Sequence, residues 1–174
     1  DFITKDQVFN DLFDWVLTNK HKDNKTCQKL TRNALLIITT NSQQIQKAIS
    51  NHQLFIQRIQ SFIDQKPDDE PVNDARIAGH FQRITELYAM QTNGTLISQL
   101  KGLPTFLIHN MSIIGFRELF ISLTTDYTEN FGLTNEDIEE LSKETNTENG
   151  YFVATAIRSI LQQKPEEERL LRKE

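Results

Sequence analysis

Apolar side chains recur every three or four residues along almost the whole chain, which is the spacing of one helix face. In the first such stripe, Val8, Leu12 and Trp15 share a face, and polar residues fill the positions between them. Similar stripes predict further helices over residues 30–38, 45–49, 54–63, 77–88, 96–100, 103–109, 116–123, 138–141 and 152–161. No segment gives a convincing strand pattern. The pattern therefore predicts an all-α fold.

Residues that cap or interrupt helices divide these stripes. Ser42 is the expected N-cap of the helix over 45–49, Pro104 fits the first turn of the helix over 103–109, and Thr134 begins a capped helix. Residues 20–25 and 68–71 are polar or acidic and are expected to be loops. The ordered region is predicted to span residues 1–163, and residues 164–174 form a charged C-terminal tail.

A shift of the sequence by 51 residues superimposes the apolar positions of a helix, a short helix and a second long helix. The matched pairs are Leu30/Phe81, Arg32/Arg83, Leu36/Leu87, Ile45/Leu96, Ile49/Leu100, Phe55/Phe106 and Ile56/Leu107. Tandem helical units behave in this way because each buries its apolar face against its neighbour. We therefore expect an armadillo/HEAT-like helical-repeat solenoid, a class that usually offers a long binding surface rather than a catalytic pocket.

Composition narrows the class of protein. The chain has 174 residues, enough for one domain with a substantial core. Its formal net charge is −5, which argues against nucleic acid as a partner, and no apolar run approaches the ~20 residues of a membrane span. The single cysteine, Cys27, fits a reducing compartment. We expect a protein of the cytoplasm, or of both cytoplasm and nucleus, that binds neither nucleic acid nor membrane.

Motifs for catalysis are absent from the sequence. The histidines (His21, His52, His80 and His109) are far apart, so a metal site would have to be assembled from distant helices. There is no Gly-x-Ser-x-Gly and no Gly-x-x-x-x-Gly-Lys segment. The sequence therefore predicts no enzyme activity, no metal and no cofactor. An enzyme whose site is built from separate helices is the remaining alternative.

Several segments resemble those of one protein family. Residues 2–12 contain Phe-Ile-Thr, then a valine, then an Asp-Leu pair, which is similar to an early stretch of SAPS-domain proteins. These proteins are regulatory subunits of the phosphatase 6 class of serine/threonine phosphatases. Weaker similarities follow in the family's order at residues 32–40, 44–49, 54–62, 67–71, 106–109, 118–123 and 148–157.

The resemblance implies a non-catalytic scaffold that binds a phosphatase catalytic subunit and directs it to substrates. This assembly would form with or without further scaffold subunits. The chain lacks the Gly-Asp-x-His and Gly-Asn-His motifs of such a catalytic subunit, which agrees with a regulatory role. A helical-repeat adaptor that binds peptide or helix partners unrelated to phosphatases is the alternative. Candidate partner-binding residues are the polar ones beside the apolar stripes, namely Arg32, Arg83, Arg117, Glu118, Asn149 and Arg158.

Overall fold

The computed structural model describes residues 3, 5–19, 25–66 and 70–163, and within these ranges the chain is all helical, with no strand. The α-helices are α1 (Asp6–Leu17), α2 (Lys25–Ile38), α3 (Gln43–Ser50), α4 (Phe55–Ile63), α5 (Glu70–Asn73), α6 (Ala75–Gln91), α7 (Leu103–His109), α8 (Ile114–Asp126), α9 (Thr128–Phe131), α10 (Asn135–Glu144) and α11 (Gly150–Gln163). A 3₁₀ helix, η1, covers Ile97–Gln99. The prediction of an all-α fold is confirmed; the predicted tail, 164–174, lies outside the described residues.

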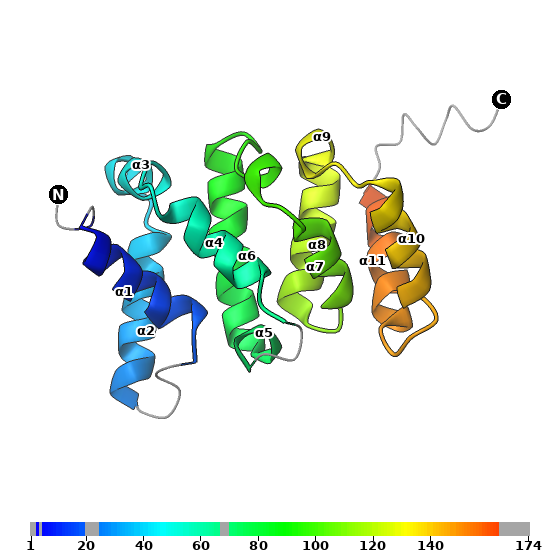
Figure 1. Ribbon diagram of the computed structural model, residues 1–174, viewed down its shortest axis with the longest axis horizontal. Coiled ribbons are helices and arrows are strands. Elements are labelled where there is room, and N and C mark those ends of the chain that lie inside the picture. The colour runs from blue at the N-terminus through cyan, green and yellow to red at the C-terminus, as the bar shows by residue number, and fades with distance from the viewer. Residues whose placement is uncertain (1–2, 4, 20–24, 67–69, 164–174) are drawn as a thin grey trace.

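The helices follow one another in a row along the long axis of the molecule, and they lie in two layers (Figure 1). Helices α1, α4, α7 and α10 form the layer nearer the viewer, and α2, α6, α8 and α11 form the layer behind. Contacts across the layers join α1 to α2, α7 to α8 and α10 to α11. Contacts along the layers join α6 to α8, α8 to α11 and α7 to α10.

Aromatic side chains hold the two layers together at the centre. Phe62 of α4 stacks on Phe81 of α6 with ring centroids 4.7 Å apart, and Phe106 of α7 meets Phe116 of α8 edge to face at 5.0 Å. Aromatic pairs at these distances prefer such offset or edge-to-face geometry. The phenylalanines expected in the core are buried at residues 55, 62, 81, 106, 116 and 120. Phe152 is only partly buried and packs against the edge of the core.

Helices α6 and α8 approach each other closely where they cross. Gly115 of α8 faces the backbone of α6, and a Cβ atom at residue 115 would lie 2.8 Å from the carbonyl carbon of Ala78 and 2.9 Å from the amide nitrogen of Gly79. Any side chain at 115 would therefore collide with main-chain atoms that cannot rotate away. This crossing fixes the spacing between the middle two helix pairs.

Helix ends follow the sequence signals in part. Thr134 and Asp137 form a capping box at the start of α10, and Pro104 lies in the first turn of α7, as predicted. Ser42 is at the N-cap of α3 but makes no side-chain cap bond. The prediction of a loop over 68–71 is wrong for residues 70 and 71, because α5 begins at Glu70. Residues 67–69 are outside the described ranges. Helix α9 was not predicted.

The apolar register inferred from the shift of 51 residues is wrong for α2. Leu30 and Leu36 are 43% and 50% exposed, whereas Phe81, the counterpart of Leu30, is fully buried. Helix α2 packs on α1 and buries Thr31, Ala34 and Ile38, and these align with Phe81, Ile84 and Tyr88 of α6 at a shift of 50. The later pairs Ile49/Leu100 and Phe55/Phe106 are buried at a shift of 51.

Candidate functional site

Exposed large apolar side chains are concentrated on one of the two layers. Among the described residues they lie on α2, α6, α8 and α11, with the single exception of Ile138 on α10. They are Leu30, Leu36, Ile37, Met90, Ile114, Tyr151 and Leu161. We call the layer formed by α2, α6, α8 and α11 the second-helix layer. A surface that retains apolar side chains in this way is typical of an interaction site.

Four of the predicted partner-binding residues are exposed on the second-helix layer. Arg32 lies on α2, Arg83 on α6, Glu118 on α8 and Arg158 on α11, so each helix of the layer carries one of these four predicted residues. Together with the exposed apolar residues they give the layer the mixed composition of a protein interface, with hydrophobic anchors among arginines. The structure thus gathers these four on one layer.

The other two predicted residues make contacts within the fold. The guanidinium of Arg117 lies 5.0 Å from the centroid of the Phe152 ring, and its Nη1 donates a 3.1 Å hydrogen bond to the main-chain oxygen of Met111. The side-chain amide of Asn149 donates to the main-chain oxygen of His109 at 3.3 Å and to Oε2 of Glu144 at 2.8 Å. Both side chains are half-buried and stabilise the C-terminal helices.

A groove of about 430 Å³ separates α2 from α6 in this layer. Its lining residues are Gln28, Thr31, Arg32, Leu35, Asp74, Arg76 and His80. Asp74 is already engaged, since its Oδ1 accepts from the amide of Arg76 at 2.9 Å as the cap of α6, and its Oδ2 lies 3.5 Å from Nη2 of Arg76. The guanidinium of Arg32 is exposed at the groove's rim.

His80 closes the inner side of this groove. Its Nδ1 lies 3.1 Å from the main-chain oxygen of Val16 in α1. Burial lowers the pKa of His80, and this effect outweighs the main-chain hydrogen bond to Val16, which raises it. The imidazole is therefore neutral at pH 7, and the positive charge of the groove comes from its two arginines, Arg32 and Arg76.

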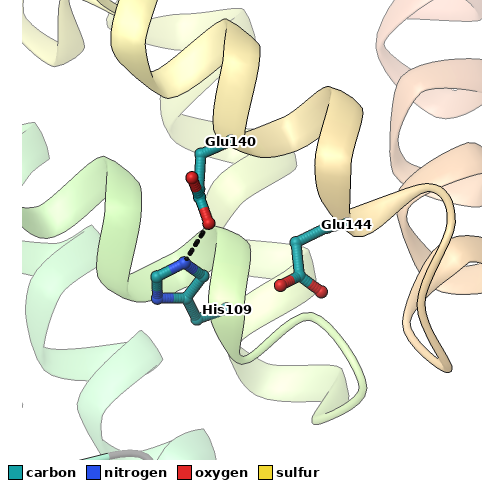
Figure 2. Close-up of side chains that lie close together, drawn as sticks. All are labelled: His109, Glu140 and Glu144. Carbon is teal, nitrogen blue, oxygen red and sulfur yellow. Dashed lines mark hydrogen bonds and ion pairs between the residues drawn. The ribbon is translucent and has the colours of Figure 1, made fainter.

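A second cluster lies between α7 and α10. His109 is the last residue of α7, and Glu140 and Glu144 are four residues apart on α10. The side chains of His109 and Glu140 point toward each other, and Glu144 lies beside them (Figure 2). One ligand atom from each residue lies within 4.8 Å of those of the other two, and all three side chains are partly buried. Imidazole nitrogen and carboxylate oxygen are both ligands of Zn²⁺.

Hydrogen bonds orient these three side chains. Nε2 of His109 lies 2.9 Å from Oε1 of Glu140, whose Oε2 accepts from Lys143 at 3.0 Å. These bonds, with that to His109 the larger effect, lower the pKa of Glu140, so its carboxylate is charged at neutral pH. Oε2 of Glu144 accepts from Thr147 at 2.9 Å and from Asn149 at 2.8 Å.

This cluster is not visible in the sequence, because metal-binding motifs are recognised by ligands that are close together in the chain. His109 and Glu140 are 31 residues apart in the chain and meet only through the packing of α7 on α10. The signal present in the sequence is the pair Glu140 and Glu144, since residues four apart share one face of a helix. That pair alone does not identify a third ligand.

Comparison of this chain with protein-family models, with curated proteins and with solved structures finds no match. None of the helices in the described part of the chain combines the length and apolar composition needed to cross a bilayer.

Proposed function

We propose that this chain is a non-catalytic helical-repeat scaffold whose second-helix layer binds another protein. The observation that carries the proposal is the distribution of exposed large apolar residues, which lie on α2, α6, α8 and α11 with Ile138 as the exception among described residues. When a partner protein covers water-exposed Leu, Ile and Met side chains, the removal of their apolar surface from water favours binding. The charged side chains beside them would give the contact its specificity.

The row of helix pairs supports an armadillo/HEAT-like architecture. Helix pairs α4/α6 and α7/α8 place aromatic residues between the layers, and Phe55 in α4 and its counterpart Phe106 in α7 are both buried. Stacked units of this kind present a continuous surface to a partner. The proposal of a solenoid rests on this correspondence and on the two layers in Figure 1.

The narrower proposal for the partner is a serine/threonine phosphatase catalytic subunit of the phosphatase 6 class. The two proteins would bind each other alone or within an assembly that holds further scaffold subunits. This proposal rests on the resemblance of residues 2–12 and of the later segments to SAPS-domain proteins. A location in the cytoplasm, or in both cytoplasm and nucleus, is part of the same proposal. The alternative is an adaptor that binds a peptide or helix unrelated to phosphatases, which would use the same layer.

The test measures binding of a purified phosphatase 6-class catalytic subunit to three forms of the chain. The first is wild type, the second combines Leu36→Ser with Met90→Ser, and the control is Ile138→Ser on the other layer. The exposed fractions of the three leucine, methionine and isoleucine side chains are similar, at 50%, 64% and 54%. The double variant loses two apolar contacts with the partner, so its binding should be weaker by about tenfold or more. The control should bind as wild type does.

Each outcome decides between the proposals. Equal binding by all three forms would show that the second-helix layer is not the binding face. If wild type does not bind the catalytic subunit at all, the phosphatase assignment is wrong. A partner that is not a phosphatase, and whose binding is weakened by the double variant but not by Ile138→Ser, would then support the adaptor alternative.

A further inference from the structure

We propose that His109, Glu140 and Glu144 bind one divalent transition-metal ion, Zn²⁺, between α7 and α10 (Figure 2). This site is independent of the second-helix layer, because its ligands come from α7 and α10 in the other layer. It supplies one imidazole nitrogen and two carboxylate oxygens, and water would complete the coordination. Three protein ligands with a water in the fourth position is a common arrangement for zinc.

The kind of ligand selects the kind of metal. Ca²⁺ and Mg²⁺ prefer sites made of oxygen ligands alone, whereas imidazole favours transition metals such as Zn²⁺. The two carboxylates bring two negative charges, which compensate the charge of the ion. Lys143 bonds to Oε2 of Glu140, which leaves Oε1 of that carboxylate facing the imidazole. The donor set therefore fits Zn²⁺ better than the alkaline-earth ions.

The distances require one small rearrangement. Ligand atoms about 2.1 Å from a tetrahedral zinc ion are about 3.4 Å apart. The His109–Glu140 distance, 2.9 Å, is already within about half an ångström of that value, but the cluster as a whole extends to 4.8 Å. The Glu144 carboxylate must therefore move inward by at most about 1.4 Å, which a partly exposed side chain can do by small changes in its dihedral angles.

Neighbouring groups form hydrogen bonds with two of the ligand residues. Thr147 and Asn149 both donate to Oε2 of Glu144, so its Oε1 is left for the ion. Asn149 also donates to the main-chain oxygen of His109, which ties the start of α11 to the end of α7. Hydrogen bonds of this kind orient metal ligands and raise metal affinity.

A bound ion would join α7 to α10 at the C-terminal ends of both helices. The N-terminal end of α10 is already attached to α7 by the 2.9 Å hydrogen bond from the Thr105 hydroxyl to Asp137. The ion would thus add a link at the other end of α10 to the contacts that already join the last helix pair to the pair before it. The expected result of binding is a more stable C-terminal part of the molecule.

The experiment is a calorimetric titration of the full chain with ZnCl₂, after chelator treatment and desalting. We expect one ion per chain with a Kd of about 10 μM or tighter. Glu144→Gln should weaken binding at least tenfold, because it removes a charged ligand but keeps a hydrogen-bond acceptor. The matched control is Glu139→Gln, an exposed neighbour on α10 with the same loss of charge, which should bind as wild type.

A second readout separates the site from binding elsewhere on the chain. Zn²⁺ should raise the Tm of wild type and of Glu139→Gln, but not that of Glu144→Gln or His109→Gln. Binding should also weaken in acid, since the coordinating imidazole must be unprotonated. If no saturable binding occurs up to 1 mM, or if Glu144→Gln and His109→Gln titrate as wild type does, the proposal is wrong. Neither result bears on partner binding by the second-helix layer.

Discussion

The hydroxyl of Tyr88 in α6 donates a 2.9 Å hydrogen bond to the main-chain oxygen of Ile38, the last residue of α2. Both residues are fully buried, and burial raises the pKa of Tyr88, so the phenol remains protonated and can donate at any ordinary pH. A carbonyl at a helix end has no partner within its own helix. Tyr88 supplies that partner and joins α2 to α6 at one end of the groove between them.

Replacement of Tyr88 by Phe should therefore destabilise the protein. The buried oxygen of Ile38 would lose this donor, which costs about 1–3 kcal/mol in the free energy of unfolding. Urea denaturation measures the change. Tyr151→Phe is the control, because Tyr151 is 76% exposed and its variant should stay within about 0.5 kcal/mol of wild type. Equal stability of the two variants would contradict the importance of the Tyr88–Ile38 bond.

The α6–α8 crossing gives a second prediction, in which two glycines respond oppositely to the same substitution. Gly115→Ala forces a Cβ atom against the backbone of Ala78 and should cost about 1–3 kcal/mol. Gly79→Ala should instead stabilise by about 0.5–1 kcal/mol, because a Cβ there meets nothing within 4 Å and alanine favours the helix. Thermal unfolding of both variants checks the signs. A stabilised Gly115→Ala variant would show that the helices are not this close.

The start of α10 depends on Asp137. Its carboxylate accepts from the amide of Thr134 at 2.9 Å, from the hydroxyl of Thr134 at 2.6 Å and from the hydroxyl of Thr105 in α7 at 2.9 Å. Asp137→Ala should lower the free energy of unfolding by about 1–3 kcal/mol. Glu136→Ala, at the exposed neighbouring position, is the control and should change it by less than about 0.5 kcal/mol.

The effect of Asp137→Ala should also depend on pH. Burial raises the pKa of Asp137, but the hydrogen bonds from Thr134 and Thr105 lower it more, so the pKa in the folded protein is below the usual 3.8. A carboxyl group of this kind stabilises the fold above its unfolded-state pKa and ceases to do so as the pH falls through its folded-state pKa. The difference between wild type and variant should therefore narrow below pH 3.8. A difference that is constant from pH 7 to pH 2.5 would contradict this account.

His80 should make the fold sensitive to mild acid. Burial lowers its pKa below 6.5, so below that pH the unfolded chain binds a proton that the folded protein resists. The free energy of unfolding should decline as the pH falls from 7 to 5.5. His80→Gln has no titrating group and should show a shallower decline over that range, as measured by urea unfolding at each pH. His52→Gln, at a histidine that stacks on Phe9 near the N-terminal end of α1, is the comparison variant. A slope that His80→Gln leaves unchanged would exclude His80 as the cause.

The helices were predictable because their apolar spacing is regular, but the face that α2 buries was not. Four apolar residues follow one another at 35–38, so the pattern fits several faces of the helix equally well. Packing on α1 selects the face that carries Ala34 and Ile38 and leaves Leu36 exposed. Sequence periodicity cannot make that choice, because it depends on which helix lies next to α2. The start of α10, by contrast, was predictable from Thr134, since a capping box is a local interaction.

The residues of the candidate sites also differ in whether local sequence features could predict them. The exposure of Arg32, Arg83, Glu118 and Arg158 was predictable, because the position of a polar residue beside an apolar stripe is a local feature. The roles of Arg117 and Asn149 were missed because their partners, Phe152 and His109, are 35 and 40 residues away. The same holds for His109 and Glu140, whose contact exists only once α7 lies beside α10. Long-range contacts of this kind need the fold itself.

The backbone contact at Gly115 bears on how the molecule can bend. No flexible side chain separates α8 from α6 at that point, so a pivot there would have to pull two main chains apart or force them into each other. Helix α1 is likewise attached to the central helices, because Asp14 pairs with Arg58 of α4 and the Val16 oxygen contacts His80 of α6. Any change in the curvature of the molecule must therefore leave the α6–α8 spacing as it is.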